Sequence, residues 1–257
     1  MSRFGNLEFA DSSSENLPSR SSAGAAGPGL REAELAFRRG DFEHALRLYG
    51  RILQEEPHHV GAWVGQVRML VELGELKEAG VWADKALEQF PQEAELLAAK
   101  AVTLARSGDL RGALAFSDAA IAERGDTPYV WLARGDVLLA RAEKRADYCF
   151  NRALGGGGGD WIWSWLASRV HFFYRKFSLA LKLITQALTL DGSQAVIWLQ
   201  LGRCQLALGM SAVGEESLAQ ARELDPHCPE AQVVARECRD YRWWDRVFGR
   251  VRHWLEK

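Results

Sequence analysis

Hydrophobic residues recur at helical spacing in the stretch 60–91, and a glycine interrupts them midway. Residues three and four positions apart share one face of an α-helix, and here that face holds Trp63, Val67 and Leu70. Gly74 follows where a tight turn is needed, because glycine adopts left-handed dihedrals without a Cβ clash. Small residues then repeat at helical spacing before the proline that ends the unit: Ala79, Ala83, Ala86 and Pro91. The stretch predicts a helical hairpin that needs neighbours to bury both of its faces.

The same landmarks return at a fixed interval along the chain. Gly40, Gly74 and Gly108 are 34 residues apart, and the alanine five residues after each glycine recurs at the same interval. A period of this length is typical of stacked hairpins. We count six units, at 26–59, 60–93, 94–127, 128–159, 160–194 and 195–228.

This order of tryptophan, small residue, leucine, glycine, two alanines and proline resembles the tetratricopeptide repeat (TPR) family. Six units in nearly constant phase carry the resemblance, which extends over most of the chain. The resemblance implies an all-α, right-handed superhelical solenoid of about six TPR helix hairpins with a C-terminal capping helix. It also implies that the first helix of each unit lines an inner wall, where family members commonly bind a peptide or helix of a partner protein.

Composition shifts divide the chain into five segments. We expect a disordered tail at 1–29, TPR units one to four at 30–154, a poly-glycine turn between repeats at 155–159, units five and six at 160–228, and a capping or amphipathic helix at 229–257. The tail contains one apolar cluster, formed by Phe4, Leu7 and Phe9. This cluster is either a docking motif, for a partner or for the chain's own groove, or incidental.

The five glycines of 155–159 do not form a phosphate-binding loop. That motif needs a following Gly-Lys-Ser/Thr, and Asp160 stands there instead. A linker between independent domains would break the repeat phase, yet Ala153 and Ala187 keep the interval of 34 residues. We therefore expect the glycines to replace the ordinary turn, so that the stack continues through a soft joint.

The phase of the fifth unit is ambiguous by one residue. Aligning Trp163 with Trp63, Trp131 and Trp198 requires one extra residue before Phe177, and this is the alignment we favour. It places on the core side Leu166, Ala167 and Val170. It places on the inner wall Ser164, Ser168 and His171.

The C-terminal segment combines aromatic and basic residues at helical spacing. Its candidate contact residues are Trp243, Trp244, Arg246, Phe248, Arg250 and Trp254. Two interpretations remain open. The rings are core residues of a cap on the sixth unit, or they project and contact a protein partner or a membrane surface.

Composition excludes several classes of function. The net charge is −2, with 47% apolar and 26% charged residues, which is ordinary for a soluble protein and argues against a general nucleic-acid binder. No apolar window is long enough to span a membrane, and the first residues do not indicate a secretory signal. We expect a cytoplasmic protein, peripheral at a membrane if the C-terminal helix docks there.

Neither cofactor, metal nor catalysis is indicated. The four cysteines contain no C-x-x-C pair and are expected to be free thiols in a reducing compartment. A metal site at His227, Cys228 and Cys238 would lack a fourth ligand at a recognisable spacing. His171 has no Ser, Cys or Asp placed to form a catalytic pair, so we predict that the chain is not an enzyme.

The candidate partner-binding groove consists of the residues that lie next to the core stripe on the surface of each first helix, on the concave side of the solenoid. It comprises Leu30, Glu34, Phe37, Val64, Arg68, Val71, Ala98, Val102, Tyr129, Leu132, Asp136, Leu139, Trp161, His171, Phe172, Leu199, Arg203 and Leu206. The wall is mostly apolar, which suits an amphipathic helix or an apolar extended segment. The alternative is that neighbouring helices partly fill these positions.

TPR domains that grip the C-terminal carboxylate of chaperones carry Lys, Arg and Asn in the first two rows of this wall. This chain has Leu30, Glu34, Val64 and Arg68 there, so that resemblance fails. We predict a non-enzymatic protein-interaction module or assembly scaffold, with a peripheral membrane adaptor as the alternative. Neither the partner nor the oligomeric state follows from the sequence.

Overall fold

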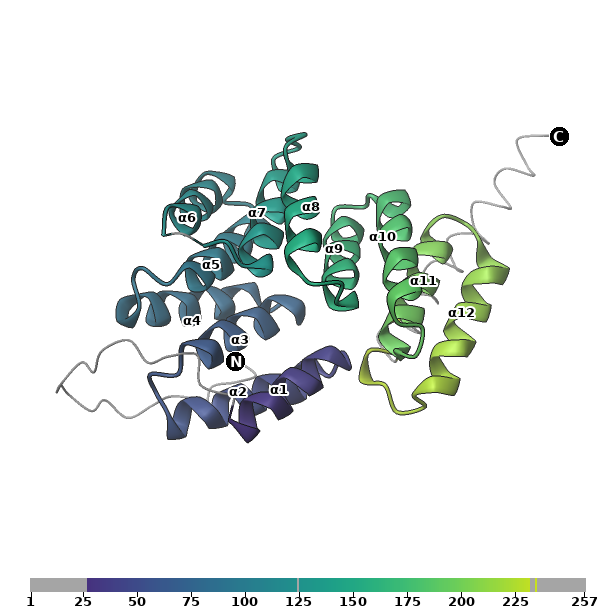
Figure 1. Ribbon diagram of the computed structural model, residues 1–257, viewed down its shortest axis with the longest axis horizontal. Helices are drawn as coiled ribbons and strands as arrows, with labels where there is room; N and C mark the ends of the chain where they lie inside the picture. The colour runs from purple at the N-terminus through teal and green to yellow at the C-terminus, as the bar shows by residue number, and fades with distance from the viewer. Residues whose placement is uncertain (1–26, 124, 232–233, 235–257) are drawn as a thin grey trace.

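The computed structural model describes residues 27–123, 125–231 and 234. Within these ranges the chain forms twelve complete α-helices, the start of a further helix at residue 229 and no strand, which confirms the all-α solenoid (Figure 1). The helices are α1 (Pro28–Arg38), α2 (Phe42–Glu55), α3 (Val60–Glu72), α4 (Leu76–Gln89), α5 (Ala94–Ser107), α6 (Leu110–Ala122), α7 (Pro128–Ala140), α8 (Ala146–Gly156), α9 (Trp161–Phe173), α10 (Phe177–Leu190), α11 (Ala195–Ala207) and α12 (Ser211–Leu224). Consecutive helices pair as six hairpins.

Each hairpin turns at one residue with a left-handed backbone. Four hairpins use the glycine that the sequence pattern predicts, with φ of 73°, 78°, 94° and 79° at Gly40, Gly74, Gly108 and Gly209. The other two place a side chain in the same conformation, at Ala142 (φ 56°) and Arg175 (φ 58°). A non-glycine residue in this region is strained, because its Cβ approaches the following carbonyl oxygen.

Small residues bring the two helices of a hairpin close together. The predicted core stripes are buried, and Ala79, Ala83 and Ala86 are fully shielded from solvent. Gly65 of α3 lies against Tyr49 of α2, so closely that an added Cβ would come within 2.4 Å of the tyrosine ring. Close packing of this kind links each hairpin to its neighbour. It produces one large core along the array and a smaller cluster in the third and fourth repeats, formed by Ala101, Ala105, Ala113 and Val137.

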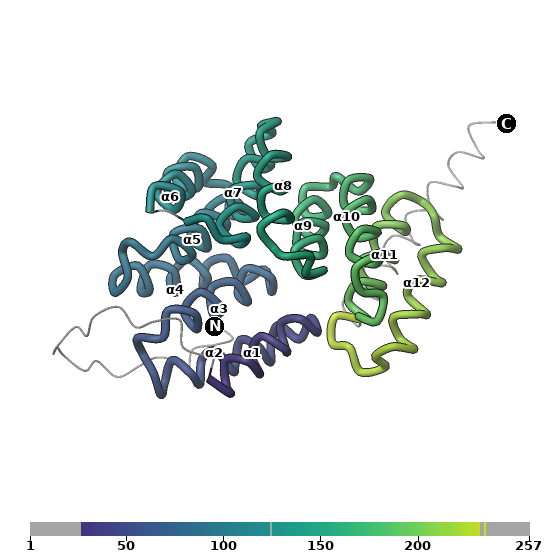
Figure 2. The backbone as a smooth tube through the Cα atoms, in the orientation of Figure 1, coloured from purple at the N-terminus to yellow at the C-terminus, as the bar shows by residue number. Residues whose placement is uncertain are grey.

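The array curves until its two ends meet. Figures 1 and 2 show the hairpins following an arc that brings α1 beside α9 and α11. Arg38, at the end of α1, donates two hydrogen bonds of 2.7 and 2.8 Å to the Asp160 carboxylate, which caps α9. The ring of Trp165 in α9 packs against Phe37 and Phe42, at centroid distances of 6.0 and 6.3 Å. The first repeat therefore contacts the fifth directly.

Two boundaries differ from the sequence-based expectation. Helix α1 begins at Pro28, inside the segment expected to be disordered, because proline fits the first turn of a helix, where its missing N–H is not needed. Helix α8 continues through Gly155 and Gly156, so the turn between the repeats is confined to 157–159. A further helix begins at residue 229. The apolar cluster in the tail and the aromatic segment 243–257 lie outside the described residues.

The phase favoured for the fifth unit is wrong by one residue. Arg175 follows Ser164 at the interval at which Gly74 follows Trp63, so Ser164, not Trp163, occupies the tryptophan position. Ser164 is accordingly buried, whereas Trp163 is half-buried and covers Gly157. The shift turns a different set of α9 side chains to the inner face: Trp165, Arg169 and Phe172.

Candidate binding site on the inner face

The inner face of the solenoid is largely filled by its own side chains. Most of the predicted groove residues are buried: Phe37, Val64, Val71, Ala98, Val102, Tyr129, Leu132, Asp136, Trp161, His171, Leu199 and Leu206. The half-buried members are Leu30, Arg68, Leu139, Phe172 and Arg203, and Glu34 is exposed. In the middle of the inner face the remaining cavity has a volume of about 30 Å³. The closed arc therefore leaves no room there for a partner helix.

Arginines stack on aromatic rings across this interior. The Arg68 guanidinium lies 4.9 Å from the ring centre of Phe37 and 4.1 Å from that of Tyr129, which joins the first, second and fourth repeats. Arg38 lies 4.8 Å from the ring centre of Trp161. Cation–π contacts of this kind are stronger where water is excluded, so Arg68 acts as a structural residue of the closed arc.

The one-residue error in the phase of the fifth unit excluded Arg169 from the predicted inner wall. Its Nε and Nη2 atoms donate to Glu72 Oε2 at 2.9 and 2.7 Å, and Nη1 donates to Glu230. Burial favours the neutral form of Glu72, but Arg169, together with Arg106 and Arg68, outweighs it and lowers the pKa of Glu72 below its ordinary value. Counting back from Phe177, the first residue of α10, would have identified Arg169 from the sequence.

His171 belongs to the packing between two repeats and not to the open wall. Its ring lies 4.5 Å from that of Phe150 in α8, and its Nδ1 is 2.8 Å from the carbonyl oxygen of Ala167. Burial lowers the pKa of His171, which favours the neutral imidazole. No hydrogen bond from a Ser, Cys or Asp side chain reaches this ring within the described residues, and it forms no catalytic pair there.

A second buried ion pair lies beside Arg169. Arg106 of α5 donates from Nη2 to Asp136 Oδ2 at 2.9 Å, and the Tyr174 hydroxyl donates to Asp136 Oδ1 at 2.7 Å. Burial and the negative charge of Asp136 together raise the pKa of Tyr174, so its hydroxyl stays protonated and remains a donor. This cluster joins the third, fourth and fifth repeats.

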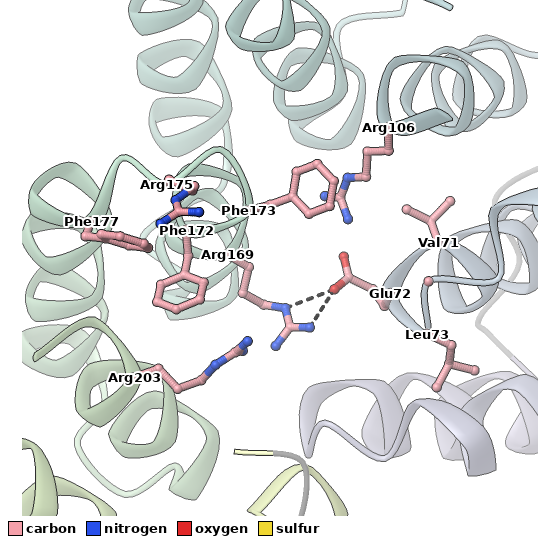
Figure 3. A pocket seen from close by; sticks show the side chains of 11 residues that line it. Val71, Glu72, Leu73, Arg106, Arg169, Phe172, Phe173, Arg175, Phe177 and Arg203 are labelled. Atoms are coloured by element: carbon pink, nitrogen blue, oxygen red, sulfur yellow. Dashed lines mark hydrogen bonds and ion pairs between the residues drawn. The ribbon is translucent and has the colours of Figure 1, made fainter. Parts of the chain in front are cut away.

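Beside these clusters a pocket of about 410 Å³ opens between the C-terminal ends of the first helices. We call it the arginine pocket (Figure 3). Its lining comes from α3, α5, α9, α10, α11 and the turns next to them: Val71, Glu72, Leu73, Gly74, Arg106, Arg169, Phe172, Phe173, Arg175, Phe177 and Arg203. Figure 3 shows Arg169 pointing across the pocket to Glu72, with the phenylalanines gathered on the α9 side.

Two of the lining side chains are exposed to solvent. Phe173 is 49% exposed while the Arg106 guanidinium lies 4.9 Å from its ring centre. Arg175 is exposed, with no side-chain hydrogen bond or ion pair to any described residue. The arginine pocket is thus a part of the inner face where, among the described residues, an aromatic ring and a guanidinium group remain exposed to solvent.

The cysteines in the described region do not form a reactive or metal-binding site. Cys149, Cys204 and Cys228 are free and buried, and burial raises the pKa of the Cys204 thiol to about 11. No group of three or more His, Cys, Asp or Glu residues is placed to hold a metal ion among the residues that the structure covers. Within the same residues, no helix combines the length and the hydropathy that a membrane span requires.

Comparisons with known proteins agree with this architecture. A family model for the tetratricopeptide repeat matches residues 36–102. Among curated proteins, no relative matches the chain. Similar solved structures include a thermophilic TPR protein of Thermus thermophilus, with a TM-score of 0.53 and 19% identity over 69% of this chain and 97% of that one. A tetratricopeptide repeat protein from Parabacteroides merdae has a TM-score of 0.53 and 16% identity over 82% of each chain.

The APC/C hetero-tetramer Cut9–Hcn1 contains another similar structure, with a TM-score of 0.50 and 14% identity. The match covers 82% of this chain but 42% of that one. At these identities the likeness shows the fold alone. The matched family model and the shared architecture agree: residues 36–102 match the tetratricopeptide repeat, and the fold of the described residues is similar to that of TPR proteins.

Proposed function

We propose that this chain is a protein-interaction scaffold that holds a segment of a partner protein at the arginine pocket. Tetratricopeptide repeats as a class serve as protein-interaction scaffolds. The observation that carries the proposal for this chain is the exposed ring of Phe173 beside an open pocket, on an inner face that is otherwise filled. Exposed apolar side chains in a concave site are typical of surfaces that a partner covers.

The proposed site differs from the long apolar groove that the sequence suggests. A helix lying along the whole inner wall would need the space that Phe37, Arg68 and Tyr129 occupy. The arginine pocket, at about 410 Å³, has room for a few side chains. A short segment of a partner is therefore the better fit.

A photo-crosslinking experiment tests this proposal. A photo-reactive phenylalanine analogue at position 173 is expected to crosslink a partner, whereas the same analogue at position 148 is not. Tyr148 is the matched control, because it is 61% exposed on α8 and does not line the pocket. The partner is then purified and its affinity measured against variants of the full chain.

Phe173→Ala should weaken binding of the purified partner by roughly tenfold, which corresponds to losing one partly buried aromatic contact. Tyr148→Ala should leave the affinity unchanged. Equal crosslinking at both positions, or equal affinity of both variants, would contradict the proposal.

A further inference from the structure

The arginine pocket has a chemical character that narrows the class of partner. Within the described residues, its lining contains Arg106, Arg169, Arg175 and Arg203 and a single carboxylate, Glu72. Two further carboxylates, Asp136 and Glu230, pair with these arginines from outside the lining. Among the described residues, four guanidinium groups thus face three carboxylates, and the Arg175 side chain lies on the solvent side.

Arg175 carries the guanidinium group that forms no ion pair with the described carboxylates. The side chains of Arg106 and Arg169 are held by buried ion pairs of 2.9 and 2.7 Å. Arg175 is exposed and pairs with no described residue. A fixed guanidinium fork recognises carboxylate groups by paired hydrogen bonds, and Arg175 is free to make them.

The backbone at Arg175 supports the same assignment. Its φ of 58° lies in the left-handed region that four of the six hairpins fill with glycine. An arginine at this turn costs folding free energy that a glycine would not. Strained residues that persist in a fold are often those that a binding site requires.

The pocket is also aromatic, which argues against a simple anion as its ligand. Phe172 and Phe177 are half-buried and Phe173 is exposed. A bare phosphate or carboxylate ion would leave these rings in water, whereas an apolar side chain would cover them. The complementary ligand therefore carries acidic and apolar groups side by side.

We propose that the arginine pocket binds an acidic segment of a partner protein, in which an aspartate or glutamate pairs with Arg175 and a neighbouring apolar residue packs on Phe173. This assignment rests on the proposed scaffold function and names the ligand class of the same site. Its two contact residues, Phe173 and Arg175, lie at and just after the C-terminal end of α9. They stand outside the two rows that grip a chaperone terminus, whereas Arg169 and Arg203 of the lining belong to the second row.

Fluorescence anisotropy with the full chain tests the assignment. The probe is a short labelled peptide that alternates aspartate or glutamate with phenylalanine or leucine, and the control peptide carries the matching amides, asparagine and glutamine. We expect the acidic peptide to bind about tenfold more tightly than its amide counterpart. We also expect its affinity to fall as salt screens the charges.

Matched variants distinguish the effect of losing the Arg175 charge from the effect of changing the backbone at a turn. Arg175→Gly removes the guanidinium and suits the left-handed turn, so it is expected to fold and to weaken binding of the acidic peptide about fivefold. Ala142→Gly makes the same backbone change at the equivalent turn of the fourth repeat, outside the pocket, and should leave binding unchanged. Arg111→Gln removes an exposed charge from α6 and should also have no effect.

Several outcomes would overturn the assignment. These are no binding of the acidic peptide at millimolar concentration, equal affinity for the amide peptide, or equal affinity of Arg175→Gly and Ala142→Gly. A gain in peptide affinity on removal of residues 1–26 would assign the pocket to the chain's own N-terminal segment instead of a partner.

The crosslinking experiment distinguishes the two proposals. If the crosslink at position 173 maps to a neutral partner segment, the scaffold function stands and the acidic ligand class is wrong. If no crosslink forms there, both are wrong.

Discussion

At the scale of single residues, the apolar stripe predicts the core but does not predict which polar residues join it. Trp63, Val67 and Leu70 are buried as their spacing predicts. Gln66 lies among them at 0% exposure, and neither its amide oxygen nor its nitrogen has a hydrogen-bond partner within the described residues. A buried amide without a partner loses its hydration and gains nothing in return.

Gln66→Leu is therefore expected to stabilise the chain by roughly 1–3 kcal/mol, because it removes an unsatisfied polar group at nearly constant volume. Urea denaturation followed by circular dichroism measures the change in free energy of unfolding. Gln200→Leu is the matched control. Gln200 is also buried, but its amide bonds to Ser168 at 3.3 Å and to Arg203 at 3.2 Å.

The control variant should lower stability by about 1 kcal/mol, the contribution of a typical hydrogen bond. A stabilisation of equal size in both variants would show that leucine fills space at either site, and that the missing partners of Gln66 carry no cost.

At the scale of helices and turns, the repeat period locates the hairpins but fails where one residue is missing. Helix α9 begins 33 residues after α7, whereas α5, α7 and α11 each begin 34 residues after the first helix of the preceding repeat. The apolar pattern could not correct the phase, because tryptophans stand at 161, 163 and 165. The true register is marked by the turn residue Arg175 and by Phe177, which begins α10, but glycine is absent from this turn.

The glycine run between α8 and α9 contains two kinds of position. Gly155 is helical and exposed, with no atom within 4 Å of an added Cβ, whereas Gly159 has a φ of 80°. Gly155→Ala should stabilise the chain by about 0.5–1 kcal/mol, since alanine loses less backbone entropy in a helix. Gly159→Ala should destabilise it by roughly 1–2 kcal/mol, the cost of a side chain in the left-handed region.

Thermal denaturation of the two variants, compared with the wild type, measures these opposite shifts. Shifts of the same sign would contradict the division of the run into a helical end and a left-handed turn.

At the scale of the whole molecule, the inner wall illustrates the limit of sequence reasoning. The sequence predicts rows of first-helix residues along the inner wall, but the burial of these residues depends on how far the arc closes. Closure depends on long-range contacts such as that between Arg38 and Asp160, which are 122 residues apart. The pitch of the superhelix is a sum of small rotations between repeats, and no local pattern encodes it.

Arg169 connects the ends of this arc, since it pairs with Glu72 of the second repeat and with Glu230 beyond the sixth. Arg169→Met should cost roughly 3–5 kcal/mol of unfolding free energy, because it leaves two buried carboxylates without their main partner. Arg134→Met is the control. Its partner Asp118 is largely exposed, and losing such a pair costs about 1 kcal/mol or less.

The pH dependence distinguishes lost charge pairing from lost packing. In the wild type the pKa of Glu72 is lowered, so its contribution to stability is present above the unfolded-state pKa and is lost as the pH falls through the folded-state pKa. In Arg169→Met, burial without the arginine is expected to raise this pKa. The variant should then lose stability as the pH rises through the region above about pH 4. Urea denaturation between about pH 3 and 8 measures both slopes, because the wild-type loss lies below the ordinary glutamate pKa of about 4.3. A parallel pH dependence in the two proteins would show that Arg169 supports the closed arc by packing alone.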